Sequence, residues 1–267
     1  MQFDNPVMEN LMTRASVRRF TEQEISEETI AKLVRAGQQA PFTGQMYSVI
    51  VTKDSLQKEK MAGYFGALPR LGNVFMLICV DFARLERFIK AKGRENSYED
   101  QRMMIMGIQD AAYFAQNIVT AAESYGIGSV FLGRVPWCAK ELKEIFKLPN
   151  RVWPMVGLVL GYKAEQPPPR PRIPLETVLH CEEYKELDDD GIEAALQIMD
   201  AGLLREGYYE SRNAKVALKG SQEDRVGYDE YGWGEHISRK YGQGDGNTAE
   251  QGRDIATILQ SLGINLT

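Results

Sequence analysis

Residues 104–133, MIMGIQDAAYFAQNIVTAAESYGIGSVFLG, contain the pattern that decides the fold. Apolar and small side chains recur at helical spacing as far as Ala122, within a helical pattern that extends from Tyr98 to Gly126. A helix whose apolar residues occupy so much of its circumference is expected to be buried. Its small residues also allow another helix to approach closely, in a domain core or across a subunit interface, and the spacing favours the core. A glycine-edged strand is predicted next, at 126–133.

Strand and helix patterns alternate on both sides of this region. Further strands are predicted at 47–52, 74–80 and 152–162, and further helices from Ser26 to near Pro41, at 55–61 and at 139–146. The strand at 152–162 is almost continuously apolar, which indicates a strand covered on both faces with Pro154 at its start. Elements that interleave in this way predict an α/β protein built around one mixed sheet.

Composition excludes several classes of protein. A chain of 267 residues with 43% hydrophobic content can bury a sizeable core. Its net charge of -5 argues against a nucleic-acid binder, which needs a basic face to release counterions. The sequence has neither a signal-peptide pattern nor an apolar run long enough to cross a bilayer, so no membrane partner and a cytoplasmic location are expected.

Cysteine and histidine usage argues against metal and hydrolytic sites. The three cysteines, Cys79, Cys138 and Cys181, are widely separated, so neither a disulfide framework nor a Cys-x-x-Cys metal site is expected. Two histidines, His180 and His236, are too few for a multi-histidine metal centre. Without a Gly-x-Ser-x-Gly motif, a hydrolase is not expected. Cys79 is interpreted as a buried small apolar residue and His180 as a loop histidine with a backbone partner.

Two basic clusters are the strongest candidates for a binding site. Arg14, Ser16 and Arg18 project to one side if their segment is extended. Arg170 and Arg172 have the same spacing in a proline-rich run that cannot be the interior of a helix. Guanidinium groups suit phosphate, so the two clusters together suggest one anion site, although each pair alone is also compatible with ordinary solvated arginines.

The composition changes beyond Tyr184. The chain is therefore interpreted as a core at 1–184 with a helical C-terminal extension at 185–267. In the extension, helices are predicted at 192–209 and 249–262, and the run 242–246 is predicted to be a glycine-rich loop because it lacks the spacing of a dinucleotide-binding motif.

Five motifs occur in an order that identifies a family. They are Arg14-Ala15-Ser16-Val17-Arg18-Arg19-Phe20, Ala40-Pro41-Phe42, Ala121-Ala122-Glu123-Ser124-Tyr125-Gly126-Ile127-Gly128, Phe131-Leu132-Gly133 and Pro171-Arg172-Ile173-Pro174-Leu175. This order resembles the FMN-dependent nitroreductase family over roughly residues 8–184. The tail, with Tyr208-Tyr209 and Arg212, resembles the larger, oxygen-insensitive nitroreductase and flavin-reductase branch.

The resemblance implies a homodimer with FMN bound in two interface clefts. It implies an α+β fold of the nitroreductase type, with a mixed, mainly antiparallel sheet flanked by helices and the long central helix at the dimer interface. The cofactor-binding residues that it implies are Arg14, Ala15, Ser16, Arg18, Ala40, Pro41, Phe42, Phe131, Leu132, Gly133, Arg170 and Arg172. On the family pattern, the cations at 14, 170 and 172 and Ser16 hold the phosphate and ribityl chain. Arg18 lies near the pyrimidine end of the ring, 40–42 come from the second subunit, and 131–133 back the ring.

The sequence also departs from the family pattern. The segment 40–42 lacks the hydroxyl groups common in relatives, Gly66 replaces a polar side chain, and Arg134 replaces a small residue. In relatives of this branch, one region supplies basic residues for the NADPH 2′-phosphate. The corresponding region of this sequence is lengthened and acidic. It contains Glu223, Asp224, Asp229 and Glu230 together with Lys215, Lys219 and Arg225. NADPH and NADH therefore both stay open as electron donor.

The function implied is an NAD(P)H oxidoreductase that passes two electrons to nitroaromatics, quinones or free flavins by a ping-pong sequence. No protein side chain is assigned as a catalytic acid or base, because the flavin carries the chemistry. One alternative is a dedicated flavin or metal-chelate reductase. Others are a flavin-binding sensor with an altered cleft and a CoA- or nucleotide-binding module without flavin.

Overall fold

The computed structural model describes residues 3–218, 220, 223–242 and 254–266. The chain divides into two compact units, one formed by 1–168 together with 254–267 and the other by 169–253. The division thus lies at residue 168, whereas the change in composition lies at residue 184. The last residues of the chain return to the first unit.

A four-stranded sheet forms the centre of the first unit. Its order is β1 (Tyr47–Thr52), β2 (Val74–Asp81), β4 (Val152–Tyr162) and β3 (Ile127–Leu132), and all neighbours are antiparallel. An isolated parallel bridge joins Ser16 to Ser129 and makes the sheet mixed. The predicted strands and the α+β class with a mainly antiparallel sheet are confirmed.

Pro154 lies inside β4 rather than at its start. The register between β2 and β4 shifts between Ile78 and Cys79, and Pro154 is the partner of Cys79 directly after the shift. A β-bulge removes the need for a regular ladder bond at that position, which explains how a central strand accommodates a proline.

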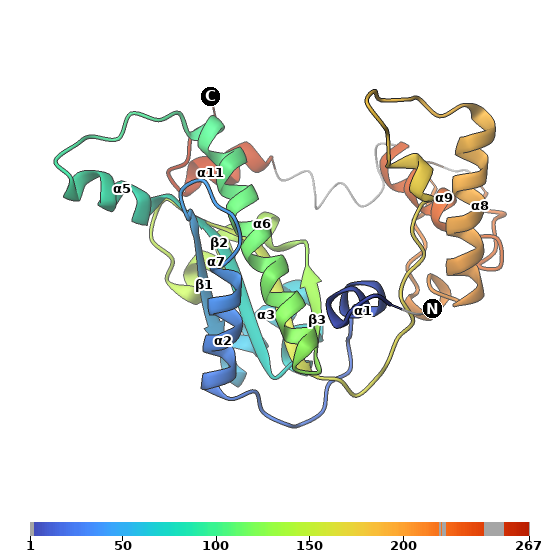
Figure 1. Cartoon of the computed structure of the whole chain (residues 1–267), viewed down its shortest axis with the longest axis horizontal. Coiled ribbons are helices and arrows are strands. Elements are labelled where there is room, and N and C mark those ends of the chain that lie inside the picture. Colours follow the sequence, from blue (N-terminus) through green and yellow to red (C-terminus); the bar gives the residue numbers. More distant parts are fainter. Residues whose placement is uncertain (1–2, 219, 221–222, 243–253, 267) are drawn as a thin grey trace. The chain divides into compact units, whose positions relative to one another are not determined.

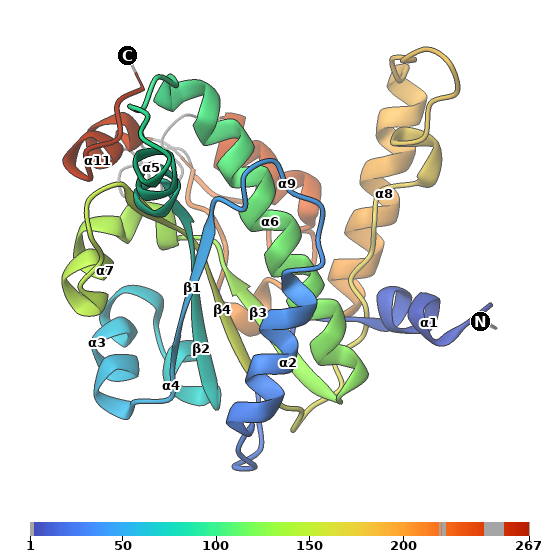
Figure 2. The same ribbon diagram turned by 60° about the vertical axis from the view of Figure 1, so that its left-hand side comes forward.

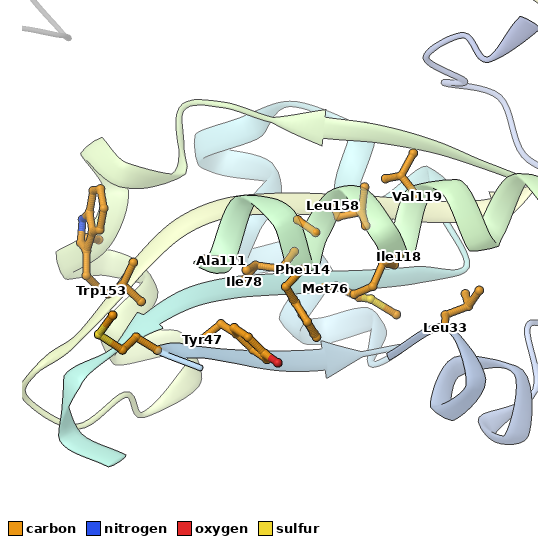
Figure 3. Packing of buried hydrophobic residues seen from close by; sticks show 14 of the residues in the cluster. Leu33, Tyr47, Met76, Ile78, Ala111, Phe114, Ile118, Val119, Trp153 and Leu158 are labelled. Atoms are coloured by element: carbon orange, nitrogen blue, oxygen red, sulfur yellow. The ribbon is translucent and has the colours of Figure 1, made fainter. Parts of the chain in front are cut away.

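Helices cover both faces of the sheet (Figure 2). α2 (Glu27–Gly37) and α6 (Asp100–Ser124) lie on one face, and α3 (Ser55–Phe65), α4 (Leu68–Leu71) and α7 (Ala139–Phe146) lie on the other. β2 is buried throughout because its alternate residues enter two different cores. Met76 and Ile78 pack against Phe114 and Ile118 of α6, as Figure 3 shows, whereas Phe75 and Leu77 face α3 and α7.

Only one side of α6 is buried. Its buried residues are Met104, Gly107, Asp110, Ala111, Phe114, Ala115, Ile118, Val119 and Ala122. On the opposite side, Ile105 is 62% exposed, Tyr113 47% and Ile108 37%. The expectation of a helix buried around its circumference is wrong for the single chain, because one sheet can cover only one side of a straight helix. The small residues do serve the core: a Cβ at Gly107 would lie 2.6 Å from Cγ1 of Val80.

Three α-helices of the first unit, α1 (Pro6–Thr13), α4 and α5 (Phe82–Ala91), have no counterpart in the sequence-based prediction. α1 begins after Asn5, whose side chain accepts bonds from the amides of Val7 and Met8. α5 begins after Asp81, which accepts a bond from the amide of Arg84. In α1 and α5 the N-cap side chain accepts hydrogen bonds from amides of the first turn, as Asn and Asp commonly do. The 3-10 helix η1 (Val135–Cys138) precedes α7.

The second unit is helical. It contains η2 (Leu175–Thr177), α8 (Asp189–Arg205), η3 (Glu210–Arg212), α9 (Trp233–Ile237) and η4 (Ser238–Gly242), and Figure 1 shows its elements. α8 starts three residues earlier than predicted because Asp188 caps it. The glycine-rich run beyond Gly242 lies outside the described residues, as does the first part of the predicted final helix. The remainder of that helix is α11 (Ile255–Ser261), which packs on the first unit's core.

The cysteines differ sharply in accessibility. Cys79 and Cys138 are buried and Cys181 is exposed. Burial also raises the pKa of the Cys79 thiol, so that its reactive thiolate is disfavoured. We expect a disulfide reagent to modify one thiol rapidly in the native protein and all three in denaturant. Rapid modification of Cys79 in the native state would contradict the core packing described above.

Candidate functional site

The segment that contains Arg14, Ser16 and Arg18 is extended, which is the condition under which these three side chains share one side. The amide of Val17 donates to the carbonyl oxygen of Ser129 at 3.0 Å, and Ser16 forms the parallel bridge with the same residue. Burial alternates along the segment: Ala15 and Val17 are buried, whereas Arg14, Ser16 and Arg18 are partly exposed. Two cations and a hydroxyl therefore lie on the side of the segment opposite to Ala15 and Val17, and the Nε and Nη2 atoms of Arg14 are themselves buried there.

Gly128 permits this close packing against β3. A Cβ at position 128 would lie 2.7 Å from Cγ2 and 2.8 Å from Cβ of Val17. No larger residue fits there without displacing the segment. The glycine in the predicted glycine-edged strand thus has a specific purpose, which is to let the basic segment lie against β3.

Glu165 holds the second half of the segment. One of its carboxylate oxygens accepts bonds from the amides of Arg18 at 2.7 Å and Arg19 at 3.1 Å. The amide of Thr21 donates to the carbonyl oxygen of Tyr162 at 2.9 Å. The backbone that carries Arg18 is therefore fixed by charge-assisted bonds, which are the stronger kind.

The segment Ala40–Phe42 follows α2 directly. Ala40 is buried, whereas Pro41 and Phe42 are exposed. The backbone beyond it is bonded to Asp110, a buried carboxylate of α6. The segment therefore presents the side chains of Pro41 and Phe42 on a surface, while Asp110 holds the main chain that follows.

The end of β3 is open on one side. Phe131 is partly buried, Leu132 is 7% exposed, and Gly133 is exposed. A Cβ added at Gly133 would meet nothing within 4 Å beyond the neighbouring residues of the chain. The protein itself therefore does not require a glycine at position 133. The open backbone at Gly133 is compatible with a planar ligand that lies beside it.

Arg170 and Arg172 belong to the second unit. Arg170 forms an ion pair with Glu206, and its guanidinium lies 4.1 Å from the ring centre of Tyr208. Arg172 is exposed and donates to the carbonyl oxygens of Arg170 and Pro171 at 3.0 Å each. The charge of Arg170 is thus compensated, whereas Arg172 stays at the surface of its unit.

Acidic residues of the lengthened segment, residues 215–230, form ion pairs with neighbouring cations. Asp224 binds Arg239, which is 1% exposed, and Lys215, at 2.7 and 2.9 Å. The guanidinium of Arg239 and then the ammonium of Lys215 hold the pKa of Asp224 well below its usual range. Arg225 pairs with Glu223 at 2.9 Å, and Lys219 lies outside the described residues. Part of the acidic charge thus compensates neighbouring cations.

Neither histidine has the surroundings of a catalytic acid. The Nδ1 atom of His180 accepts a bond from the amide of Lys185 at 3.4 Å, which confirms the interpretation of a loop histidine with a backbone partner. Burial, assisted by Lys240, lowers the pKa of His236, which stacks on Tyr209. Among the described residues, no cluster of three or more histidine, cysteine or carboxylate side chains is suited to hold a metal ion.

Two carboxylates important for the site, Asp110 and Glu165, are absent from the sequence-based prediction. The sequence could have indicated the importance of Asp110, because it is an acidic residue on the otherwise apolar side of the predicted helix. No sequence pattern indicates the role of Glu165, because it lies in a polar loop and accepts hydrogen bonds from residues more than a hundred positions away.

The comparison with known proteins decides the family. Residues 11–162 match the model of the nitroreductase family. The chain belongs to this family. The resemblance recognised in the five motifs is thereby confirmed.

Several relatives of this family member are similar to it over most of their length. The chain is 38% identical over 67% of its length to a Cr(VI) reductase of Pseudomonas sp. (strain G-1), of which it covers 75%. It is 32% identical over 73% of its length to an FMN reductase [NAD(P)H] of Bacillus subtilis, of which it covers 80%. The solved NfrA1 nitroreductase from B. subtilis superposes with a TM-score of 0.81 at 25% identity, covering 98% of this chain and all of that one.

Proposed function

We propose that the protein is an FMN-dependent NAD(P)H oxidoreductase that reduces nitroaromatics, quinones or free flavins. The observation that carries the proposal is the basic segment at 14–18, held extended against β3 in a nitroreductase fold. Two guanidinium groups and a hydroxyl on one side of a strand match the phosphate and hydroxyl groups of a flavin nucleotide. The relatives named FMN reductase and nitroreductase support the same cofactor and donors.

The residues of the chain have separate tasks in this proposal. On the family pattern, Arg14, Ser16, Arg170 and Arg172 would bind the phosphate and ribityl chain. Arg18 would place a positive charge near the pyrimidine end of the ring, where the reduced cofactor is negative. Ala40, Pro41 and Phe42 would contact the cofactor from the second subunit. Ala15 and the strand end Phe131–Gly133 would line its other side.

When bound, FMN supplies the group that accepts two electrons from a nicotinamide and passes them to the acceptor. The protein contributes binding and orientation. The side chains at 14, 16 and 18 are two cations and a hydroxyl, and we assign no catalytic side chain.

We also propose that the protein is a homodimer in the cytoplasm. The exposed side of α6 carries Ile105, Ile108 and Tyr113, and α1 exposes Val7 and Leu11. Apolar side chains gathered in this way are typical of an interface. No helix within the described ranges is long and apolar enough to cross a membrane.

An absorption spectrum of the purified protein tests the cofactor. We expect flavin bands after purification or after addition of FMN, bleaching under anaerobic NADPH or NADH, and return of the bands on adding an acceptor. A protein that takes up no FMN would contradict the proposal. A yellow protein inert to both nucleotides would instead be the flavin-binding sensor.

The relative named as a Cr(VI) reductase favours one rival acceptor class. A dedicated flavin or metal reductase would have the same spectrum and differ only in its acceptors. Comparing kcat/KM for a nitroaromatic, a quinone, free FMN and chromate separates the two functions. The nitroreductase proposal expects a nitroaromatic or a quinone to give the highest value, whereas a dedicated flavin or metal reductase would give it with free FMN or chromate.

A further inference from the structure

Asp110 is a buried carboxylate with an unusual set of partners. It lies on α6 and is 1% exposed. One oxygen accepts a bond from the amide of Thr43 at 2.6 Å, and the other accepts from the amides of Gly44 and Met46 at 3.0 Å each. Three main-chain donors from one short loop therefore converge on a single negative charge.

The loop that these bonds hold is exposed through its side chains. Pro41, Phe42 and Thr43 are exposed, and Phe42 is 54% exposed. Exposed connections between a helix and a strand are usually the mobile parts of a domain. Here the main chain is fixed while the side chains face outward.

Further contacts tie both ends of the loop to the same helix. The Asn117 side chain donates to the carbonyl oxygen of Ala36 at 3.3 Å. Gly37 packs so closely that a Cβ there would lie 2.8 Å from the Phe114 ring, and Tyr47 stacks on that ring at 4.3 Å. Asp110 is thus the central one of several attachments between α6 and residues 36–47.

A buried carboxylate is a costly way to hold a loop. A charge removed from water is strongly disfavoured unless hydrogen bonds replace its hydration. An apolar residue at position 110 would fill the same stripe of α6 without that cost, but it would leave the three amides without an acceptor. The Asp110 carboxylate therefore fixes the conformation of the loop and does not improve the packing of the core.

We propose that Asp110 is a positioning residue of the flavin site. It holds the main chain of 43–46 so that Ala40, Pro41 and Phe42 are presented to the cofactor in one conformation. A loop fixed before binding loses less conformational entropy on binding, which increases affinity. The inference rests on the proposed function, because it takes 40–42 to contact FMN.

The variant Asp110→Asn tests the proposal. It keeps the size of the side chain but replaces one acceptor by a donor that faces an amide. We expect the FMN dissociation constant of the apo-protein, measured by quenching of flavin fluorescence, to rise at least about tenfold. Amide hydrogen exchange of Thr43, Gly44 and Met46 should accelerate about tenfold or more.

Asp100→Asn is the matched control. Asp100 is also a carboxylate of α6, with its side chain 12% exposed, and it binds Arg151 and the amide of Asn265 instead of the loop. Both variants should lower the melting temperature, but the control should leave FMN affinity and loop exchange unchanged. Equal loss of affinity in both would reduce Asp110 to a general stability residue and overturn the proposal.

Two further outcomes separate the inference from the function on which it rests. If wild-type protein binds FMN and Asp110→Asn binds it equally well, the inference alone is wrong. If wild-type protein binds no FMN, the proposed function is wrong and the inference is wrong with it. Wild-type exchange gives a test that needs no variant: unprotected amides at Thr43 and Gly44 would overturn the anchoring, and protected ones support it.

Discussion

Replacing Arg14 by alanine is expected to weaken FMN binding at least about 30-fold, equivalent to about 2 kcal/mol or more. Arg14 begins the extended segment that lies against β3, and on the proposed function its guanidinium binds the cofactor phosphate. A guanidinium–phosphate contact combines charge with two parallel hydrogen bonds, and no other side chain replaces it without rearrangement. The variant should therefore purify with clearly less flavin.

Arg19→Ala is the control for this prediction. Arg19 belongs to the same segment, but its side chain is 82% exposed and lies 3.9 Å from Glu165, so we expect its loss to change FMN affinity little. Flavin content, the dissociation constant and the melting temperature should be measured for both variants. An unchanged dissociation constant in Arg14→Ala, with the fold intact, would remove the basic segment from the cofactor site.

Saturating FMN distinguishes lost binding from lost chemistry. If Arg14 acts only by binding, adding excess FMN to the variant should restore most of the turnover number. A turnover number that stays low with the site filled would assign Arg14 a further effect on the bound cofactor.

Local patterns predicted most of the first unit's fold. The bounds of β1, β4 and α7 agree with the sequence-based ranges, because β-branched runs and a clear amphipathic stripe define them. α5 was missed since Phe82–Ala91 begins directly at the end of β2 and is rich in charge, which conceals its apolar side. Its cap, Asp81, is a residue of the preceding strand.

Long-range contacts set the limit on predicting the site. The spacing of the arginines predicted the basic segment, and the motif order predicted a role for the loop at 40–42, but neither showed what holds them. Asp110 and Glu165 act on main-chain amides, and the amide of any residue is chemically equivalent to that of any other. The packing of α6 and of the end of β4 determines which amides they bind, and this packing cannot be predicted from a local sequence pattern.

Arg151 makes the largest stability contribution that we predict. Its guanidinium binds Asp100 at 2.5 and 2.6 Å, Glu86 at 2.6 Å and the carbonyl oxygen of Gly263 at 2.6 Å. Its amide donates to the carbonyl oxygen of Leu262 at 2.7 Å. The side chain therefore joins the middle of α5 and the start of α6 to the C-terminal segment that follows α11.

We expect Arg151→Ala to lower the free energy of unfolding by about 3–5 kcal/mol, because it leaves two largely buried carboxylates without their cation. Denaturant unfolding measures the change. Arg87→Ala, an exposed position on α5, should change stability by less than about 0.5 kcal/mol. A loss in Arg151→Ala no larger than in this control would show that the cluster contributes little.

The dependence on pH adds a second test of the same cluster. Burial by itself would raise the pKa of Asp100, but bonds from Arg151 and from the amide of Asn265 outweigh it, so the pKa lies below its ordinary value of 3.8. A lowered pKa in the folded state contributes stability that is present above about pH 4 and is lost as pH falls through the folded value. Wild-type protein should therefore lose more stability than Arg151→Ala on acidification below about pH 4, and the difference between them should shrink. A difference that stays constant from about pH 7 to about pH 3 would mean that Arg151 stabilises the fold through packing alone.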